Sequence, residues 1–227
     1  NKGKIVIISG PSGSGKTTLH KMLLESPALK GKLVKSISAT TRPRRPGEKN
    51  GRDYLFMTPK RFEYKIRAGH FLEWQKVFAN YYGTPRTNVR QLLKAGKHVL
   101  LCIDVKGAKV VRRMFPDAVS VFIKTPSVAI LKKRLEARAQ DNHQSKALRL
   151  EIAKQELREA KHYDHRIVND RFHNRHEIDT ESDGGIPPIF RLGSLMRLHG
   201  EIHHEIFHAT CNLFTAVLIT AGTCFHD

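Results

Sequence analysis

The stretch SGPSGSGKTT at residues 9–18 constrains the fold of this 227-residue chain more than any other feature. It follows KIVIIS at 4–9, a short apolar and β-branched run that is typical of a buried strand, and it opens into a segment with helical spacing at 16–25. A strand, a glycine-rich turn and a helix in this order predict the start of an α/β fold with a mostly parallel sheet.

The same stretch matches the pattern G-x-x-x-x-G-K-[ST], in which backbone N–H groups turn inward around phosphate oxygens at a helix N-terminus. We expect Lys16 to neutralise the β- and γ-phosphates of a nucleoside triphosphate, and Thr17 to place its hydroxyl on Mg²⁺. The residues expected to bind the triphosphate in this loop are Gly10, Pro11, Ser12, Gly13, Ser14, Gly15, Lys16, Thr17 and Thr18.

Further strands and helices alternate along the chain. The predicted strands lie at 98–103, 118–124 and 167–170, and the predicted helices at 106–114, 127–138 and 145–161. Strands that alternate with helices of these lengths predict βαβ units, so we expect a mainly parallel sheet with helices on its flanks.

Residues 36–92 depart from this alternation and predict an inserted lobe of mixed α/β structure. Within it, DYLFM at 53–57 and FLEWQKVF at 71–78 are typical of neighbouring antiparallel strands around a short helix at 59–68.

Positive charge is concentrated in the first 170 residues. The chain carries 40 Lys and Arg against 21 Asp and Glu, a formal net charge of +19, and residues 1–170 hold 36 and 14 of them. This excess favours an anionic partner such as a nucleotide, a nucleic acid or an acidic membrane surface, and charge alone does not choose among them.

The three cysteines show no paired spacing, so we expect no disulfide framework and a reducing compartment. No basic and apolar leader precedes the first strand, and a cytoplasmic location is the expectation.

Three arginines and two prolines fill residues 42–46, within SISATTRPRRPGEKNGRDY at 36–54. A solvated basic loop, a nucleic-acid patch and a phosphate clamp all fit this composition. Arginine forks can pair bidentately with a phosphate, and the prolines limit the loop entropy that is lost in holding them.

Together with GPSGSGKTT, the segments SISATTRPRRPGEKNGRDYLF, FLEW, NYYGT and IDVKGA resemble the guanylate kinases, P-loop enzymes that phosphorylate GMP with ATP. The resemblance runs in unbroken order from about Lys4 to Asp170. It implies a P-loop kinase core at 1–35, 93–135 and 151–170, a GMP-binding lobe at 36–92 and a helical lid at 136–150, followed by a tail of unknown role at 171–227.

The resemblance also implies roles for single residues in GMP binding. The GMP phosphate is expected on Arg42, Arg45, Tyr54 and Tyr82, and the guanine base on Ser38, Glu73, Thr84 and Asp104. A carboxylate at Glu73 can accept two hydrogen bonds from guanine N1–H and the N2 amine, which adenine does not offer. Arg44 has no such role and fits an ordinary surface position.

Phosphoryl transfer needs alignment and charge neutralisation more than covalent help, so we expect no general base. The resemblance implies that Lys16, Arg134, Arg138 and Arg149 are the catalytic cations, and it places Asn169 near the adenine of ATP. Cys102 stands where relatives often carry an acidic residue, which predicts weaker binding of the Mg²⁺ cofactor.

The tail contains His204, Glu205 and His208 with the spacing H-E-x-x-H. In a histidine-rich segment this spacing favours adventitious metal binding over a metalloprotease. The 17 residues 209–225 carry no charge, but their threonines favour a packed or partner-facing segment over a bilayer helix, so membrane association is not expected.

Two other functions stay open on the sequence. Guanylate-kinase-like domains of scaffold proteins bind peptides without catalysis, although they typically lack a working phosphate loop, and Lys16 and Thr17 are present here. A nucleic-acid-binding protein is favoured by charge but carries no recognised DNA or RNA motif. We therefore expect ATP and GMP as partners, no specific nucleic acid, and a monomer or homodimer.

Overall fold

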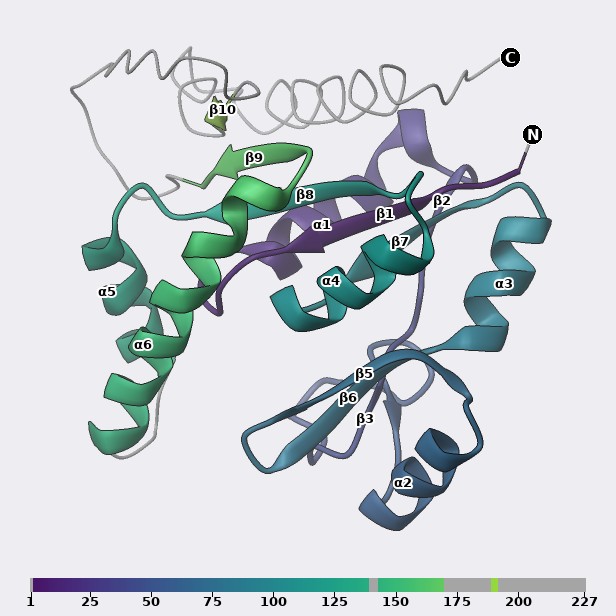
Figure 1. The fold of residues 1–227 in the computed structure, drawn as a ribbon, viewed down its shortest axis with the longest axis horizontal. Helices are drawn as coiled ribbons and strands as arrows, with labels where there is room; N and C mark the ends of the chain where they lie inside the picture. Colours follow the sequence, from purple (N-terminus) through teal and green to yellow (C-terminus); the bar gives the residue numbers. More distant parts are fainter. Residues whose placement is uncertain (1, 139–142, 170–188, 192–227) are drawn as a thin grey trace. The chain divides into compact units, whose positions relative to one another are not determined.

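The structure, a computed structural model, describes residues 2–138, 143–169 and 189–191 (Figure 1). The chain divides into two compact units, the first made of Asn1–Ile7 and Leu29–Val119 and the second of Ile8–Ala28 and Ser120–Asp227. The strand β1 (Ile5–Ser9) is buried at every position, and it begins in the first unit and ends in the second.

In the first unit, β1 lies beside β7 (His98–Cys102), which lies beside β2 (Leu33–Lys35). β2 and β7 run parallel, and Leu33 is in register with His98. The helices α3 (Arg86–Lys94) and α4 (Val105–Met114) precede and follow β7.

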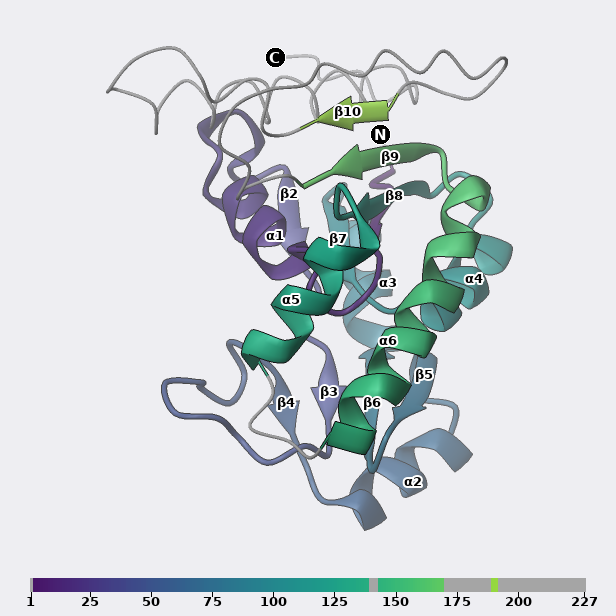
Figure 2. The same cartoon turned by 90° about the vertical axis from the view of Figure 1, so that its left-hand side faces the viewer.

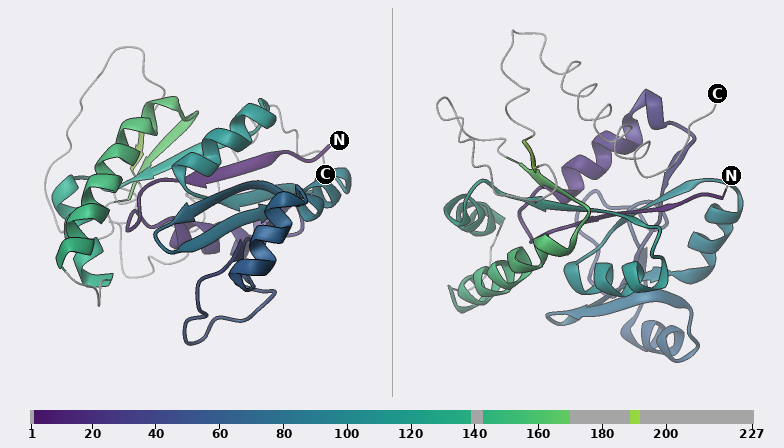
Figure 3. Two further views of the ribbon diagram at one scale, coloured as in Figure 1. Left: turned by 60° about the horizontal axis from the view of Figure 1, so that its bottom comes forward. Right: turned by 45° about the horizontal axis from the view of Figure 1, so that its top comes forward.

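The first unit also contains a separate four-stranded sheet with the order β4-β3-β6-β5 (Figure 2), whose β5–β6 hairpin and the helix α2 are the blue elements in Figure 3, left. Its elements are β3 (Ala39–Thr40), β4 (Leu55–Phe56), α2 (Pro59–Arg67), β5 (Phe71–Val77) and β6 (Asn80–Pro85). β5 and β6 form an antiparallel pair, β3 runs antiparallel to β6, and β4 runs parallel to β3.

The expected antiparallel pairing of 53–57 with 71–78 is therefore wrong. β3 and β6 lie between β4 and β5. The strand β5 turns back through Phe78 and Ala79 and pairs with β6, its neighbour in sequence, as short hairpin connections favour. β4 has only two residues, and its pairing with β3 depends on contacts that are distant in sequence.

The small sheet has an aromatic core. The ring of Phe62, which is fully buried on α2, stacks on Phe71 at 4.4 Å and on Tyr81 at 5.3 Å between ring centroids. Thr58 caps α2 by accepting a hydrogen bond from the N–H of Arg61, and Pro59 suits the first helical turn because its missing N–H is not needed there.

In the second unit the strand order continues from β1 to β8, β9 and β10. These elements are β8 (Val119–Lys124), β9 (His165–Val168) and β10 (Ile189–Arg191), with β8, β9 and β10 mutually parallel where they pair. The helices are α1 (Lys16–Glu25), α5 (Val128–Arg138) and α6 (His143–Arg158), with short 3₁₀ turns η1 (Pro27–Leu29) and η2 (Glu159–His162).

α5 and α6 lie side by side and share an apolar cluster (Figure 2). Leu131 and Leu135 on α5 and Ala153 on α6 are buried, and Leu150 and Leu157 pack against them. This contact holds both helices in one layer of the second unit.

The mainly parallel sheet with flanking helices confirms the predicted α/β class. The predicted helices form within a few residues of their expected bounds, and the helix predicted at 145–161 is divided into α6 and η2. The sequence analysis did not predict β2, β3, β6 or α3 as separate elements.

The features predicted in the tail, including His204, Glu205 and His208, lie outside the described residues. Among the residues that the structure does describe, no helix combines the length and the apolar character needed to cross a membrane.

Candidate active site

The phosphate loop of the second unit connects β1 to α1. Gly10, Gly13 and Gly15 have φ angles of 139°, 86° and 100°, in the positive region that residues other than glycine rarely adopt. A Cβ atom at Gly10 would collide with the carbonyl oxygen of Ile123, so the loop also needs glycine there for space. Gly15 is the N-cap of α1, and the loop therefore ends at a helix N-terminus as the motif requires.

Two residues outside the loop hold its backbone. Asn169, directly after β9, is buried and donates from Nδ2 to the carbonyl of Ser14 at 2.8 Å. Arg134 on α5 donates to the carbonyl of Asn169 at 3.1 Å and to that of Gly13 at 3.5 Å. The structure thus brings both predicted residues to the loop, where they link α5, β9 and the glycine-rich turn.

Lys16, Thr17 and Ser14 place polar groups at the loop in three different environments. The Nζ of Lys16 donates to the carbonyls of Gly10 and Pro11, at 2.5 and 3.0 Å, so the ammonium lies over the loop. Thr17 is exposed in the first turn of α1. The Oγ of Ser14 is buried and has no hydrogen-bond partner among the described residues.

The other two arginines predicted to be catalytic lie on α5 and α6. Arg149 is half-buried on α6. Arg138 is the last residue of α5, and its side chain is outside the described part. The two helices carry the arginines on either side of residues 139–142.

The arginine loop of the first unit is organised by an acidic side chain. Arg42, whose side chain is only 12% exposed, donates from one terminal nitrogen to both oxygens of Glu48, at 2.7 and 3.0 Å. The N–H of Arg45 donates to the same carboxylate at 2.8 Å. Burial raises the pKa of Glu48, but the hydrogen bonds from Arg42 and Arg45 outweigh burial and hold it below its ordinary value. Arg44 is exposed, as its expected surface position requires.

Aromatic rings support the Arg42 guanidinium. Its central carbon lies 5.6 Å from the centroid of Tyr54 and 5.9 Å from that of Phe56, within cation–π range. Tyr82 meets Tyr54 edge-on with centroids 6.2 Å apart. The structure therefore groups Arg42, Tyr54 and Tyr82 in one unit.

Glu73 is a buried carboxylate on β5, the edge strand of the small sheet opposite β4. It is 6% exposed on β5, in register with Thr84 on β6, whose hydroxyl donates to Glu73 Oε1 at 2.6 Å. Asp104 is the N-cap of α4, and its Oδ1 accepts from the N–H of Gly107 at 2.7 Å. Ser38 is half-buried directly before β3.

Burial raises the pKa of Glu73 from 4.5 to about 7. The hydrogen bond from Thr84 opposes this rise, and the negative charge of Asp104 adds to it. An acid whose pKa lies near 7 can lose its proton to solvent when a ligand offers hydrogen-bond donors, because these donors stabilise the carboxylate.

The raised pKa has a consequence for stability. Because the folded protein favours the neutral acid, Glu73 stabilises the fold below pH 4.5, and this contribution is lost as the pH rises through 7. A difference of about 2.5 pKa units corresponds to about 3 kcal/mol. Urea unfolding of the parent and of Glu73→Gln should therefore show the variant gaining up to about 3 kcal/mol relative to the parent between about pH 5 and pH 8. If the difference in unfolding free energy between the two proteins were the same from pH 5 to pH 8, the raised pKa of Glu73 would be contradicted.

The phosphate loop at the start of a mainly parallel α/β sheet, with a small mixed sheet inserted after β2, defines a P-loop nucleoside monophosphate kinase. The family model described as Guanylate kinase matches residues 2–178. The chain belongs to the guanylate kinase family.

Curated relatives agree with this family. The guanylate kinase of Symbiobacterium thermophilum is 45% identical over 170 residues, which cover 74% of this chain and 79% of the relative. That of Rubrobacter xylanophilus is 42% identical over 176 residues, covering 78% and 91%. A crystal structure of guanylate kinase from Anaplasma phagocytophilum matches with a TM-score of 0.59 and 34% identity, covering 74% of this chain and 77% of that one.

Sequence reasoning missed two residues that the geometry brings to these sites. Glu48 contacts Arg42 and Arg45, and an acidic residue in a loop of arginines was the available signal. Gly107 lies against Glu73, and a glycine in the first turn of a predicted helix was the signal for it.

Proposed function

We propose that this protein transfers the γ-phosphoryl group of ATP to GMP, giving ADP and GDP, and to dGMP, giving ADP and dGDP, with Mg²⁺ as cofactor, in purine nucleotide metabolism. The observation that carries the proposal is the buried Glu73 carboxylate, bonded to Thr84, in a chain with an intact phosphate loop. A buried acid on a polar partner suits guanine, whose N1–H and N2 amine both donate.

The second unit would bind the donor. The loop glycines turn N–H groups toward the ATP phosphates, and Lys16 moves from the loop carbonyls to the β- and γ-phosphates. Asn169 and Arg134 fix the loop through its carbonyls. We assign the ATP site to Gly10, Pro11, Ser12, Gly13, Ser14, Gly15, Lys16, Thr17, Thr18 and Asn169.

The metal site fits Mg²⁺ by its chemistry. Among the described residues no group of three or more His, Cys, Asp or Glu side chains gathers to hold a metal ion. Mg²⁺ needs few protein ligands because it keeps several waters and binds substrate phosphates, and the exposed Thr17 hydroxyl supplies one oxygen. When bound, Mg²⁺ neutralises charge on the β- and γ-phosphates.

The first unit would bind the acceptor. Arg42, Arg45, Tyr54 and Tyr82 surround the GMP phosphate in this proposal, and Ser38, Glu73, Thr84 and Asp104 surround the base. The GMP phosphate is itself the nucleophile, because one of its oxygens attacks the γ-phosphorus of ATP while the bond to the β-phosphate oxygen breaks. No general base is required.

We assign Lys16, Arg134, Arg138 and Arg149 to stabilising the transferring phosphoryl group. Positive charge placed on the equatorial oxygens of the transition state is the largest contribution that a protein makes to this reaction. Residues 136–150, around the end of α5 and the start of α6, would act as the lid that brings these arginines in. The core, lobe and tail boundaries given above remain part of the proposal.

A coupled assay that offers GMP, dGMP, AMP and UMP with Mg-ATP tests the proposal. Rapid turnover of GMP and dGMP, with AMP and UMP at least about 10³-fold slower, is the expected result. Binding of GMP without turnover would favour the peptide-binding alternative, and turnover of AMP as fast as GMP would refute the base assignment.

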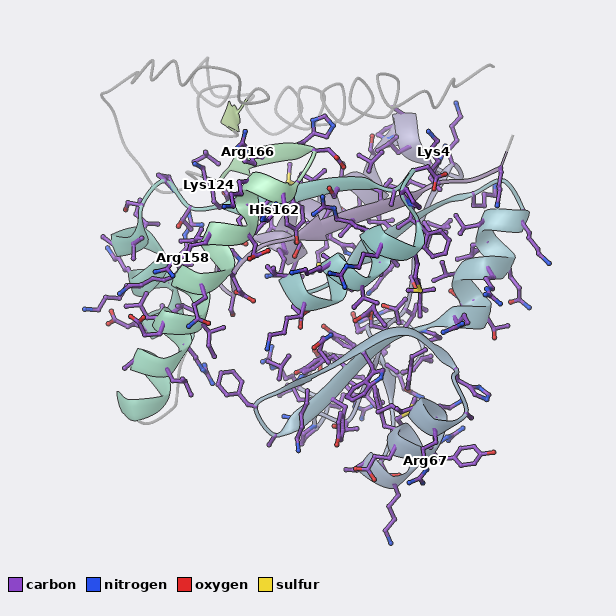
Figure 4. All side chains as sticks on the ribbon, in the orientation of Figure 1. Lys4, Arg67, Lys124, Arg158, His162 and Arg166 are labelled. Carbon is purple, nitrogen blue, oxygen red and sulfur yellow. The ribbon has the colours of Figure 1, made fainter. Side chains whose placement is uncertain are left out.

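A specific nucleic-acid partner is not part of the proposal, because the sequence carries no recognised DNA or RNA motif. In the second unit, Figure 4 shows Lys124, Arg158 and Arg166 on β8, α6 and β9, and Arg166 is buried. These residues do not form an open stripe on one element of the kind that tracks a phosphate backbone. We infer a cytoplasmic enzyme that acts as a monomer or homodimer, where its nucleotide substrates occur.

Glu48→Ala is expected to raise the KM for GMP about tenfold. Each hydrogen bond to a charged group stabilises the loop by about 1.5–3 kcal/mol, and other contacts of the loop replace only part of this stabilisation in the variant. Arg42 and the Arg45 backbone would lose the carboxylate that orients them. Steady-state kinetics at saturating ATP measures the effect. Lys49→Ala, an exposed change in the same loop, is the control, and equal KM values for the two variants would exclude an orienting role for Glu48.

A further inference from the structure

Gly107 occupies an unusual position for a glycine. It is buried in the first turn of α4, where alanine would favour the helix more. Its N–H donates to Asp104 Oδ1, which any residue except proline would also do. Helix propensity therefore does not explain the glycine, and the N-cap side chain adds only a moderate contact, since a Cβ atom at residue 107 would lie 3.3 Å from Asp104 Oδ1.

The Glu73 carboxylate provides the explanation. A Cβ atom at Gly107 would lie 2.5 Å from Glu73 Oε2 and 3.0 Å from Glu73 Cδ, closer than side chains approach one another. The carboxylate thus fills the space that a side chain at residue 107 would occupy.

The opposite side of the carboxylate is held by a hydrogen bond. Thr84 donates to Oε1 at 2.6 Å, while Oε2 faces Gly107. Glu73 is 6% exposed, so protein atoms and not water surround its carboxylate. Thr84 and the bare backbone of Gly107 together fix the plane in which the two carboxylate oxygens lie.

We propose that Gly107 is a specificity-determining positioning residue, whose missing side chain lets the Glu73 carboxylate take the orientation that pairs with guanine. This inference rests on the proposed function, because it gives Glu73 the task of base selection. In this proposal Gly107 on α4 affects base selection only through the Glu73 carboxylate, and it does not itself contact the nucleotide.

Adding one methyl group should move the carboxylate and leave the helix in place. The atoms in the way belong to side chains and not to backbone: the end of Glu73 lies closest, and Asp104 Oδ1 at 3.3 Å needs to give by only a few tenths of an ångström, so Glu73 can turn aside while the fold is kept. We therefore expect Gly107→Ala to raise the KM for GMP by about 10- to 100-fold, since misplacement by about 1 Å has effects of this size. The kcat at saturating GMP and the KM for ATP should change less than about threefold, and the preference for GMP over AMP should fall with the KM effect.

Two further variants separate positioning from general damage. Lys109→Ala introduces alanine at an exposed position of the same helix and should keep the parent KM for GMP. Thermal unfolding of Gly107→Ala should show a midpoint equal to or above that of the parent, because alanine favours the helix. A lower midpoint with losses for both substrates would mean that α4 itself is distorted, and would overturn the proposal.

A double-variant cycle with Glu73→Asp gives the decisive readout. Aspartate is one methylene shorter, so its carboxylate is withdrawn from α4 and its own KM for GMP is already raised. If Gly107 acts through the Glu73 carboxylate, adding Gly107→Ala to Glu73→Asp should change the KM less than about threefold, whereas independent effects would multiply.

The outcomes distinguish this inference from the function on which it rests. A parent protein that does not phosphorylate GMP would refute the proposed function, and this inference with it. A parent that phosphorylates GMP, with a Gly107→Ala variant whose KM for GMP stays within twofold, would refute only the role of Gly107. Multiplying effects in the cycle would do the same.

Discussion

Lys16→Ala is expected to abolish ATP-dependent phosphorylation of GMP, with kcat lowered by about 10³-fold or more, because a cation preorganised for developing phosphate charge contributes on this scale. The ammonium already lies over the loop, bonded to the carbonyls of Gly10 and Pro11. Little rearrangement is needed for it to exchange these carbonyls for phosphate oxygens.

The effect should be confined to the donor. The affinity for GMP, measured by calorimetry without ATP, is expected to stay within about threefold of the parent, since Lys16 is assigned to the ATP phosphates and GMP to residues of the first unit. Lys21→Ala on the exposed face of α1 is the matched control and should keep parental activity. Activity of Lys16→Ala within a few-fold of the parent would show that the donor site is elsewhere.

Glu73→Gln is expected to lower kcat/KM for GMP by about 10³- to 10⁴-fold, since a site built to accept hydrogen bonds discriminates on this scale. Glutamine keeps a carbonyl for Thr84 to donate to, but its amide group opposes the guanine donors where the carboxylate would accept both. The KM for ATP should not change.

The pH profile supplies a second readout for the same variant. With the parent, GMP binding should weaken as the pH falls below about 7, because the protonated acid no longer accepts two hydrogen bonds. Glu73→Gln should lose this part of the profile. Glu63→Gln, which changes a carboxylate on α2 in the same unit, is the control. Equal losses for GMP and ATP in Glu73→Gln would mean that the base pocket has been misplaced.

The phosphate loop and its neighbouring elements could be predicted because their signals are local. KIVIIS, the three loop glycines and the helical spacing after Lys16 are contiguous, and the structure places β1, the turn and α1 accordingly. The strands β8 and β9 were equally readable as short apolar runs beside helices.

The small sheet could not be predicted in the same way. β3 and β4 have two residues each, too few to show a period, and their pairing depends on residues far apart in sequence. The turn at Phe78 gave no signal, because this exposed phenylalanine takes a φ of 53° where hairpins usually carry glycine or asparagine.

The candidate site shows the same division. The residue types at Lys16 and Glu73 could be read from motifs, whereas the contact of Glu48 with Arg42 spans a loop whose backbone path no pattern specifies. Gly107 is a similar case, since its effect on Glu73 requires α4 and β5 to meet in space.

Trp74, the single tryptophan of the chain, follows Glu73 on β5. Successive residues of a strand point to opposite faces, so the indole is 42% exposed and meets Tyr81 edge-on while the carboxylate is buried. The tryptophan fluorescence of the unlabelled protein, excited at a wavelength that tyrosine does not absorb, therefore originates from one residue of the small sheet. It gives an optical reporter of that sheet whose ring is separated by the strand backbone from the side chain proposed to choose the base.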